Sequence, residues 1–190
     1  VATIIVNRWT MKYYPVENFI NEPLFYNEKL DCQENGPYVE FSPINSDGLV
    51  KNSIENKRNA IYSFLNILPK TLKNFLIYPI PEIGCDIYKR NAEIYKKTGK
   101  VIQELSFPVE EYLTRNSFVI KTFNDYIESS KLSNVVPIST ETLFCRKFKQ
   151  DECSIVHNSK HLYLDDDHIS DFGASLIVNR LTIELEEVLK

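Results

Sequence analysis

The sequence predicts an α/β fold with a largely parallel sheet. Short runs of apolar, β-branched residues alternate along the chain with segments whose apolar residues recur at helical spacing. This alternation is typical of βαβ units, in which helices cover a parallel sheet. A chain of 190 residues, 43% of them hydrophobic, is long enough to bury one sizeable core. We therefore expect a single domain over residues 1–190.

Three segments are predicted to be buried strands. Residues 2–6, with the sequence ATIIV, form an apolar run without polar alternation. Residues 74–81 form the second strand, which two prolines end, and residues 134–139 form the third. Between the first two strands, residues 21–48 contain prolines and glycines and show no period, so they are predicted to be a long loop.

Four segments are predicted to be helices, at residues 49–68, 87–97, 106–130 and 170–188. Ser106 or Pro108 would begin the third helix, since serine caps helices and proline suits their first turn. Ser170 would cap the last helix. The side of the last helix that we expect to be buried carries Phe172, Ala174, Leu176, Ile177, Leu181, Ile183 and Val188.

Composition excludes some classes of function. The net charge is −4 and the lysines and arginines are scattered, so no basic stripe predicts binding to nucleic acid. The longest apolar runs are shorter than the roughly 18 residues that cross a bilayer. The sequence opens on Val1, without an initiator Met or a signal segment, so we expect that it has been excised from a longer protein.

Asp165 and His168 are the candidate catalytic residues. An aspartate three residues before a histidine can accept a hydrogen bond from one ring nitrogen while the other ring nitrogen faces a nucleophile. The pair follows the segment HLYL and precedes the last predicted helix, where an α/β sheet carries groups to its carboxyl edge. The alternative is that residues 165–167 form a solvated acidic turn and that His168 only begins the helix.

Several motifs together resemble one family. The segment YLDDDHIS resembles the Asp-x-x-His motif of SGNH hydrolases, in the form found in extracytoplasmic domains fused to membrane acyltransferase-3 proteins. TIIVNRW at residues 3–9, IYPIPEIG at 77–84 and CRKFKQDEC at 145–153 are similar to other stretches of that family and occur in its order. Their order along the chain carries the resemblance.

The resemblance implies a three-layer α/β/α, flavodoxin-like SGNH hydrolase fold. The family places its nucleophile in a Gly-Asp-Ser motif, which does not occur in these residues. We therefore expect the first strand and helix of the fold, together with the serine, to lie outside this sequence. Asn7 and Glu82 are weak candidates for the oxyanion hole. The chain would then be a fragment of a longer membrane acyltransferase, attached to the membrane through its N-terminal part.

The implied function is the transfer of an O-acetyl group to a hydroxyl of a bacterial surface glycan, such as the O-antigen of lipopolysaccharide or peptidoglycan. His168 would act as the base and Asp165 would stabilise its imidazolium. The partners would be the glycan acceptor and an acyl donor delivered by the membrane domain, at the periplasmic or extracellular face of the inner membrane. No cofactor is expected in this domain. The alternatives are a carbohydrate acetyl-esterase with the same triad and a noncatalytic glycan-binding or scaffold domain.

Aromatic residues just beyond the first strand are candidates for binding the glycan. Trp9 and Tyr13, with Tyr14, could form an aromatic wall. A role for Trp9 in the core explains its presence equally well.

The four cysteines predict disulfide bonds. Cys145 and Cys153 enclose a charged loop of seven residues that a disulfide can close, and the resemblance implies an oxidising compartment in which such a bond persists. Cys32 and Cys85 could form a second disulfide, or they could be two buried thiols.

A metal site is the competing interpretation of the same region. Cys145, Cys153, His157 and His161 could form a Cys₂His₂ zinc set, but the gap between the cysteines is longer than zinc sites use. The aspartates do not follow the spacing of a calcium-binding EF-hand loop. We therefore expect no metal, and we expect His157 and His161 to be exposed loop residues.

Overall fold

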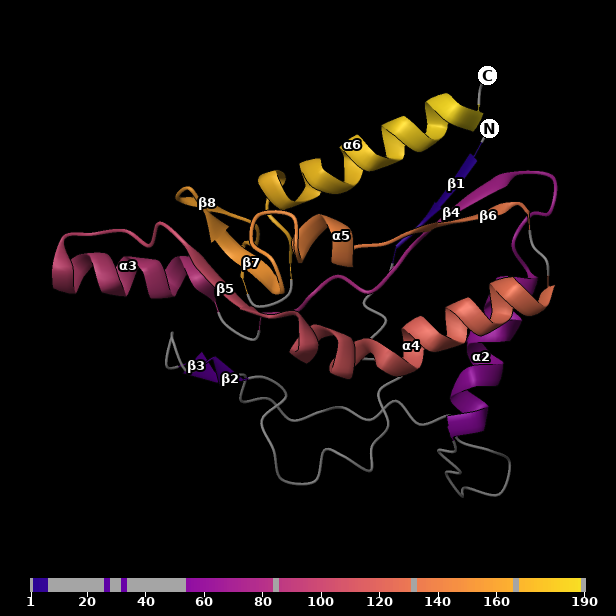
Figure 1. Cartoon of the computed structure of the whole chain (residues 1–190), viewed down its shortest axis with the longest axis horizontal. Coiled ribbons are helices and arrows are strands. Elements are labelled where there is room, and N and C mark those ends of the chain that lie inside the picture. Colours follow the sequence, from indigo (N-terminus) through magenta and orange to yellow (C-terminus); the bar gives the residue numbers. More distant parts are fainter. Residues whose placement is uncertain are drawn as a thin grey trace. The chain divides into compact units, whose positions relative to one another are not determined.

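The structure is a computed structural model that describes residues 2–6, 26–27, 32–33, 54–83, 86–130, 133–165 and 168–188 (Figure 1). The elements in chain order are β1 (Ala2–Ile5), β2 (Tyr26–Asn27), β3 (Cys32–Gln33), α2 (Ile54–Asn66), β4 (Lys73–Ile77), α3 (Ile87–Thr98), β5 (Leu105–Pro108), α4 (Val109–Ser130), β6 (Val135–Ile138), α5 (Glu141–Phe144), β7 (Glu152–His157), β8 (Lys160–His161) and α6 (Asp171–Val188).

The chain divides into two compact units. The first unit is drawn from Val1–Glu22, Gly36–Pro79 and Arg115–Pro137. The second is drawn from Pro23–Asn35, Ile80–Thr114 and Ile138–Lys190. Each unit is described by itself below.

A parallel pairing lies at the centre of the first unit. Its sheet has the strand order β1-β4-β6, and β1 runs parallel to β4 with Ala2 opposite Lys73 and Ile5 opposite Leu76. Leu76 is fully buried, as expected for a central strand that helices cover. These observations confirm the predicted α/β class and the parallel sheet.

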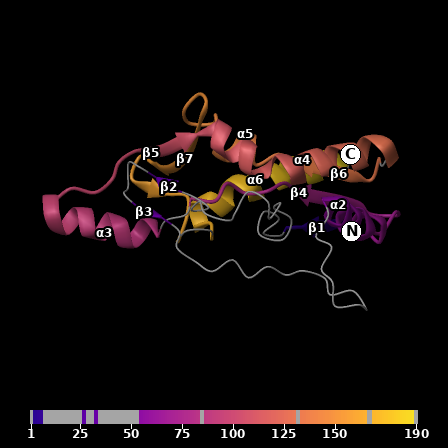
Figure 2. The same cartoon turned by 90° about the horizontal axis from the view of Figure 1, so that it is seen from below.

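Two helices cover this sheet, and the core of the unit lies beneath them. α2 and the second half of α4 lie side by side in Figures 1 and 2, and the rings of Tyr62 and Tyr126 are 5.0 Å apart between their centroids. The hydroxyl group of the buried Tyr78 has a hydrogen-bond partner, since it donates to Asn124 Oδ1 at 2.6 Å. Burial, with the negative charge of Glu128, raises the pKa of Tyr78 to about 12. The core comprises Ile5, Ile61, Leu65, Leu76, Tyr78, Val119, Phe123, Tyr126 and Val135.

The second unit contains an antiparallel sheet that the sequence did not predict. Its strand order is β5-β7-β8, and both pairings are antiparallel. The prediction that Ser106 begins a helix is wrong, because Ser106 pairs with Ser154 in the ladder between β5 and β7. α4 begins only at Val109, directly after Pro108, which ends the edge strand β5. Proline is tolerated at this position because an edge strand can forgo one ladder hydrogen bond.

Three other elements show which features of a helix or strand the local sequence determines. β4 ends at Ile77, four residues before the predicted end, ahead of the prolines at 79 and 81. α3 follows the prediction closely, because Asp86 accepts a hydrogen bond from Lys89 N at 2.9 Å and Gly99 ends the helix in the left-handed conformation. In α6 the expected buried side is wrong at its C-terminal end, where the exposed fraction of Ile183 is 51%.

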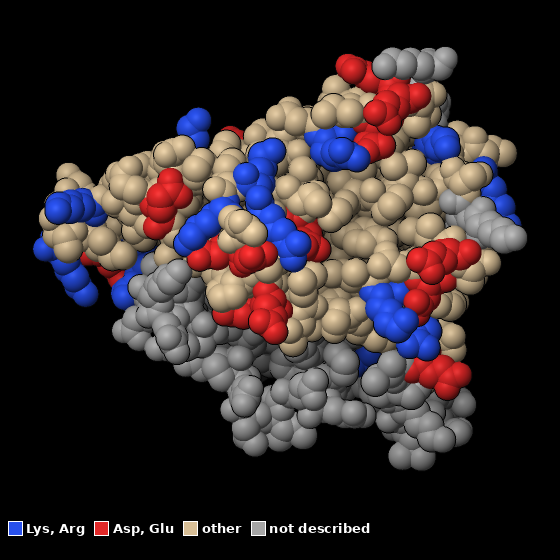
Figure 3. Space-filling model, in the orientation of Figure 1, with Lys and Arg blue, Asp and Glu red and all other residues tan. Residues whose placement is uncertain are grey.

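The surface of the described elements carries both signs of charge. On the face drawn in Figure 3, lysine and arginine side chains are interspersed with aspartate and glutamate side chains. Within the helices that the structure describes, no segment is both long enough and apolar enough to cross a bilayer.

Candidate active site

The candidate catalytic residues lie on a tight return of the chain between β8 and α6 in the second unit. Leu164 N donates to His168 O at 2.7 Å, and Tyr163 and Ile169 form an antiparallel bridge. Tyr163 is fully buried and fixes the base of the return in the core. Asp165 and His168 therefore lie at the end of a turn whose two sides are hydrogen-bonded to each other.

Asp165 faces His168 across this turn. His168 Nδ1 lies 2.8 Å from Asp165 Oδ2 and 3.0 Å from Oδ1, and His168 N donates to Asp165 Oδ1 at 2.7 Å. A carboxylate accepts hydrogen bonds, so the neutral ring carries its proton on Nδ1 and its lone pair on Nε2. The His168 side chain is 71% exposed, so the ring is accessible to a reacting group. The geometry is that of a base oriented by an acid.

The start of α6 fixes one side of the turn. The Ser170 hydroxyl accepts a hydrogen bond from Gly173 N at 3.1 Å and donates to His161 O at 2.6 Å, and Ser170 N donates to Leu162 O at 2.9 Å. Ser170 thus caps α6, as predicted, and also joins the helix to the end of β8.

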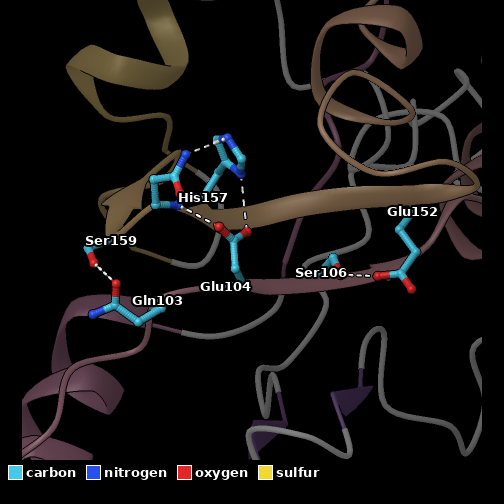
Figure 4. A network of polar contacts seen from close by, with 7 residues as sticks. Gln103, Glu104, Ser106, Glu152, His157 and Ser159 are labelled. Carbon is cyan, nitrogen blue, oxygen red and sulfur yellow. Dashed lines mark hydrogen bonds and ion pairs between the residues drawn. The ribbon is translucent and has the colours of Figure 1, made fainter.

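The other side of the turn depends on the β7–β8 hairpin. Its two turn residues, Asn158 and Ser159, have positive φ angles of 49° and 62°. Such a turn matches the twist of the paired strands, but serine adopts this conformation at some cost in free energy. Side chains just before β5 compensate, as Figure 4 shows: the Glu104 carboxylate accepts from Asn158 N at 2.8 Å, and Ser159 Oγ donates to Gln103 Oε1 at 2.6 Å.

Glu104 also contacts His157 in this network. His157 Nδ1 lies 3.1 Å from Glu104 Oε2, and the His157 ring stacks on Phe148 with centroids 4.2 Å apart. The hydrogen bond from Asn158 N is the main cause that lowers the pKa of Glu104, and the contact with His157 adds to it. The hairpin is therefore held by a carboxylate that contacts the last residue of β7 and the first residue of the turn.

His161 occupies an unexpected environment. The prediction that His157 and His161 are exposed loop residues is wrong, because both lie in strands and the exposed fraction of His161 is only 9%. Burial lowers the pKa of the His161 imidazole. The Tyr88 ring lies 4.4 Å from the His161 ring between centroids, so α3 and β8 pack together here.

A cavity of about 460 Å³ opens beside His161. α3, the β7–β8 hairpin and the start of α6 form its walls. The lining residues are Tyr88, Asn91, Ser159, Lys160, His161, Leu164, Ser170, Asp171 and Phe172. No single sequence motif marks these residues, because they come from three separate elements.

A second group of polar residues is buried near the base of the turn. The Tyr163 hydroxyl has no hydrogen-bond partner within the described ranges, and burial, with Tyr112 and Glu82 adding to it, raises the pKa of Tyr163 well above its usual value. Glu82, a weak sequence candidate for the oxyanion hole, is 7% exposed. Asn7, the other candidate, lies outside the described residues.

Cys145 and Cys153 form the predicted disulfide. The two residues also form an isolated antiparallel bridge, so the bond joins the end of α5 to β7. Because both sulfur atoms are used in this bond, the alternative zinc set of Cys145, Cys153, His157 and His161 is not formed.

Other predicted site residues lie outside the described residues. Trp9 and Tyr13, the candidates for glycan binding, are among them, and so is Cys85. Only the backbone of Cys32 is described, in β3. The second disulfide and the aromatic wall therefore stay predictions.

The fold and the turn are those of an α/β protein that presents a histidine oriented by an acid just before its last described helix. A family model described as "SGNH domain (fused to AT3 domains)" matches residues 2–182. The chain belongs to this family. No curated protein and no solved structure matches it significantly.

Proposed function

We propose that this chain is the acyl-transferring domain of a membrane acyltransferase and that it moves an acetyl group to a hydroxyl of a bacterial surface glycan. The family model is described as an SGNH domain fused to AT3 domains, which supports acyl chemistry in cooperation with a membrane partner domain on the extracytoplasmic side. The observation that carries the proposal is the 2.8 Å contact between His168 Nδ1 and Asp165 Oδ2.

The nucleophile is a serine in a segment outside this sequence, since the Gly-Asp-Ser motif of the family does not occur in these residues. His168 Nε2 accepts the serine proton as the serine oxygen forms an ester bond with the acyl carbon. The departing donor group takes that proton. Asp165 stabilises the imidazolium in the interval and keeps the ring in the orientation that the transfer needs.

The second half of the reaction transfers the acyl group to the glycan. An acceptor hydroxyl gives its proton to Nε2 as its oxygen bonds to the acyl carbon, and the serine oxygen leaves and recovers the proton. Water in place of the sugar hydroxyl would give hydrolysis. The difference between a transferase and an esterase therefore depends on a bound acceptor that outcompetes water, and the same dyad serves both reactions.

The test is the acetylation of the surface glycan in cells that carry the complete gene. Strains with the unchanged gene, with no gene, with Asp165→Asn and with His168→Gln are compared by mass spectrometry of the isolated glycan. We expect both substitutions to lower the rate of acetylation at least about a thousandfold, because a triad without its acid or base loses this much.

A matched control is Asp125→Asn on α4. Its side chain is 37% exposed, close to the 39% of Asp165, and it pairs with Lys121 on the surface of the helix. This variant should acetylate normally. Full activity of the Asp165→Asn and His168→Gln strains would refute the proposed role of the dyad, and more acetylation in the strain without the gene would indicate an esterase instead.

A further inference from the structure

The cavity beside His161 has the size and lining of a ligand site. Its volume of about 460 Å³ falls within the range of about 300–1,000 Å³ that is usual for small-molecule sites. It lies wholly within the second unit, between α3, the β7–β8 hairpin and the start of α6. The two wall segments next to the catalytic turn are fixed, because Ser170 caps α6 and Leu164 is hydrogen-bonded to His168.

The lining combines aromatic faces with polar groups. Tyr88 and Phe172 bring two rings to the cavity, and Tyr88 is 49% exposed although it is a large ring. The Lys160 ammonium lies 5.3 Å from the centroid of the Phe172 ring, and no carboxylate among the described residues pairs with it. A ligand that offers both C–H faces and hydroxyl groups matches such a lining, and a pyranose ring has both.

The orientation of His161 at this wall is fixed by Asn91 of α3. Asn91 Oδ1 accepts a hydrogen bond from Ile102 N at 2.9 Å, which directs Asn91 Nδ2 to His161 Nε2 at 3.0 Å. Since Nε2 accepts this bond, the proton of the neutral ring lies on Nδ1. His161 Nδ1 is buried and has no hydrogen-bond partner in the described part of the chain. The contact with Asn91 therefore holds the His161 ring as one part of the cavity wall.

The cavity is adjacent to the candidate catalytic turn. Leu164 and Ser170, which line the cavity, flank the segment that carries Asp165 and His168. A ring held between Tyr88 and Phe172 would therefore place its hydroxyl groups beside the turn on which the proposed base lies.

We propose that this cavity is the acceptor subsite of the domain and binds one pyranose ring of the surface glycan, held between Tyr88 and Phe172 with Lys160 directed to its hydroxyl groups. This inference rests on the proposed function and adds to it the residues that select the acceptor. No sequence motif predicted that Tyr88, Phe172 or Lys160 would bind the acceptor.

Binding of oligosaccharides to the 190-residue chain tests the proposal. The probe is a set of oligosaccharides released from the surface polysaccharide of the cells that make the protein and stripped of acetyl esters by mild base. Calorimetry or ligand-observed NMR gives the dissociation constant. We expect Tyr88→Ala to weaken binding at least about fivefold, because it removes one stacking face.

The control is Tyr95→Ala. Tyr95 lies on the same helix, is 56% exposed against 49% for Tyr88, and does not line the cavity. Its replacement should leave the dissociation constant unchanged. Equal binding by Tyr88→Ala and the unchanged chain, or an equal loss in both variants, would overturn the proposal.

Chemical-shift mapping on the unchanged chain gives an answer that does not depend on the folding of a variant. The largest shifts of backbone amides on adding the oligosaccharide should fall on Asn91, Ser159 and Lys160. Shifts that fall instead around the smaller cavity of about 140 Å³ in the first unit, which Asn66 and Asn134 line, would overturn the proposal.

The two proposals fail separately. If the cavity binds the oligosaccharide but His168→Gln leaves acetylation unchanged in cells, the proposed role of Asp165 and His168 is refuted and the acceptor subsite is supported. If His168→Gln abolishes acetylation but Tyr88→Ala binds the oligosaccharide normally, the acceptor subsite is refuted and the role of Asp165 and His168 is supported.

Discussion

Two small residues, Ser170 and Gly173, determine where Asp165 and His168 lie. The Ser170 hydroxyl receives Gly173 N and reaches His161 O, so one residue both starts α6 and joins it to β8. Gly173 allows the helix to approach, since a Cβ atom there would lie 2.2 Å from the carbonyl oxygen of Leu162. The turn between these contacts keeps its shape only if both approaches are preserved.

Gly173→Ala should therefore displace the first turn of α6 from Leu162. We expect a loss of about 1–3 kcal/mol in the free energy of unfolding, as for other overpacked sites, measured by urea denaturation. The chemical shifts of the His168 ring should change as well.

Gly99→Ala is the control for this variant. Gly99 has a φ of 70° and open space around it, so alanine should cost about 1–2 kcal/mol through backbone strain alone. The His168 ring should not shift. A Gly173→Ala variant with an unchanged His168 spectrum would show that the close approach does not position the turn.

At the scale of elements, the β7–β8 hairpin is the part that brings separate segments to the site. It pairs with β5 along one edge, and its turn accepts contacts from Glu104 and Gln103. Lys160 and His161, at its end, are two of the residues that line the cavity. The stability of this hairpin should consequently depend on the charge of Glu104.

Glu104→Gln should lower the stability of the hairpin at pH 7 by less than about 1 kcal/mol, since Glu104 is an exposed group. The pKa of Glu104 is lowered in the folded chain, so its stabilising effect is complete above the pKa of the unfolded chain, near 4.5, and is lost as the pH falls through the folded value. The difference between the variant and the unchanged chain should therefore shrink below about pH 4.5. Hydrogen exchange of the Asn158 amide measures it, and a difference that stays constant between pH 7 and pH 3.5 would contradict this role.

The disulfide joins α5 to β7 over a sequence separation of eight residues. Its reduction should lower the free energy of unfolding by about 2–3 kcal/mol, because the open loop gains conformational entropy in the unfolded chain. Urea denaturation without reductant, of the unchanged chain and of the double variant Cys145→Ala and Cys153→Ala, measures the loss. The prediction fails if the double variant is as stable as the unchanged chain.

At the scale of the whole molecule, two compact units share continuous elements. α4 begins in the second unit and continues into the first, and β6 passes from the first into the second. The candidate site and the proposed subsite both lie in the second unit, whereas the parallel sheet lies in the first. The sheet that defines the fold class is therefore not the element that carries the residues of the site.

The residues of the site differ in how far the sequence predicts them. Asp165 and His168 were predicted because they lie three positions apart in a motif, so their contact needs only a local turn. Tyr88, Asn91, Lys160 and His161 were not predicted as a group, because they lie up to 73 positions apart in the chain. His161 illustrates the difference. A histidine in this polar stretch of the sequence is expected in an exposed loop, and only its packing against Tyr88 of α3 shows that it is buried.

The amino-acid sequence by itself determined the α/β class, the parallel strands, the capped helices and the disulfide between Cys145 and Cys153, because apolar periodicity, capping residues and short loops act over a few neighbouring residues. The tertiary structure alone decided that residues 105–108 form a strand, that His161 is buried and that three elements enclose a cavity. These features depend on contacts between distant segments, whose free energy outweighs local preference and leaves no periodic pattern in the chain.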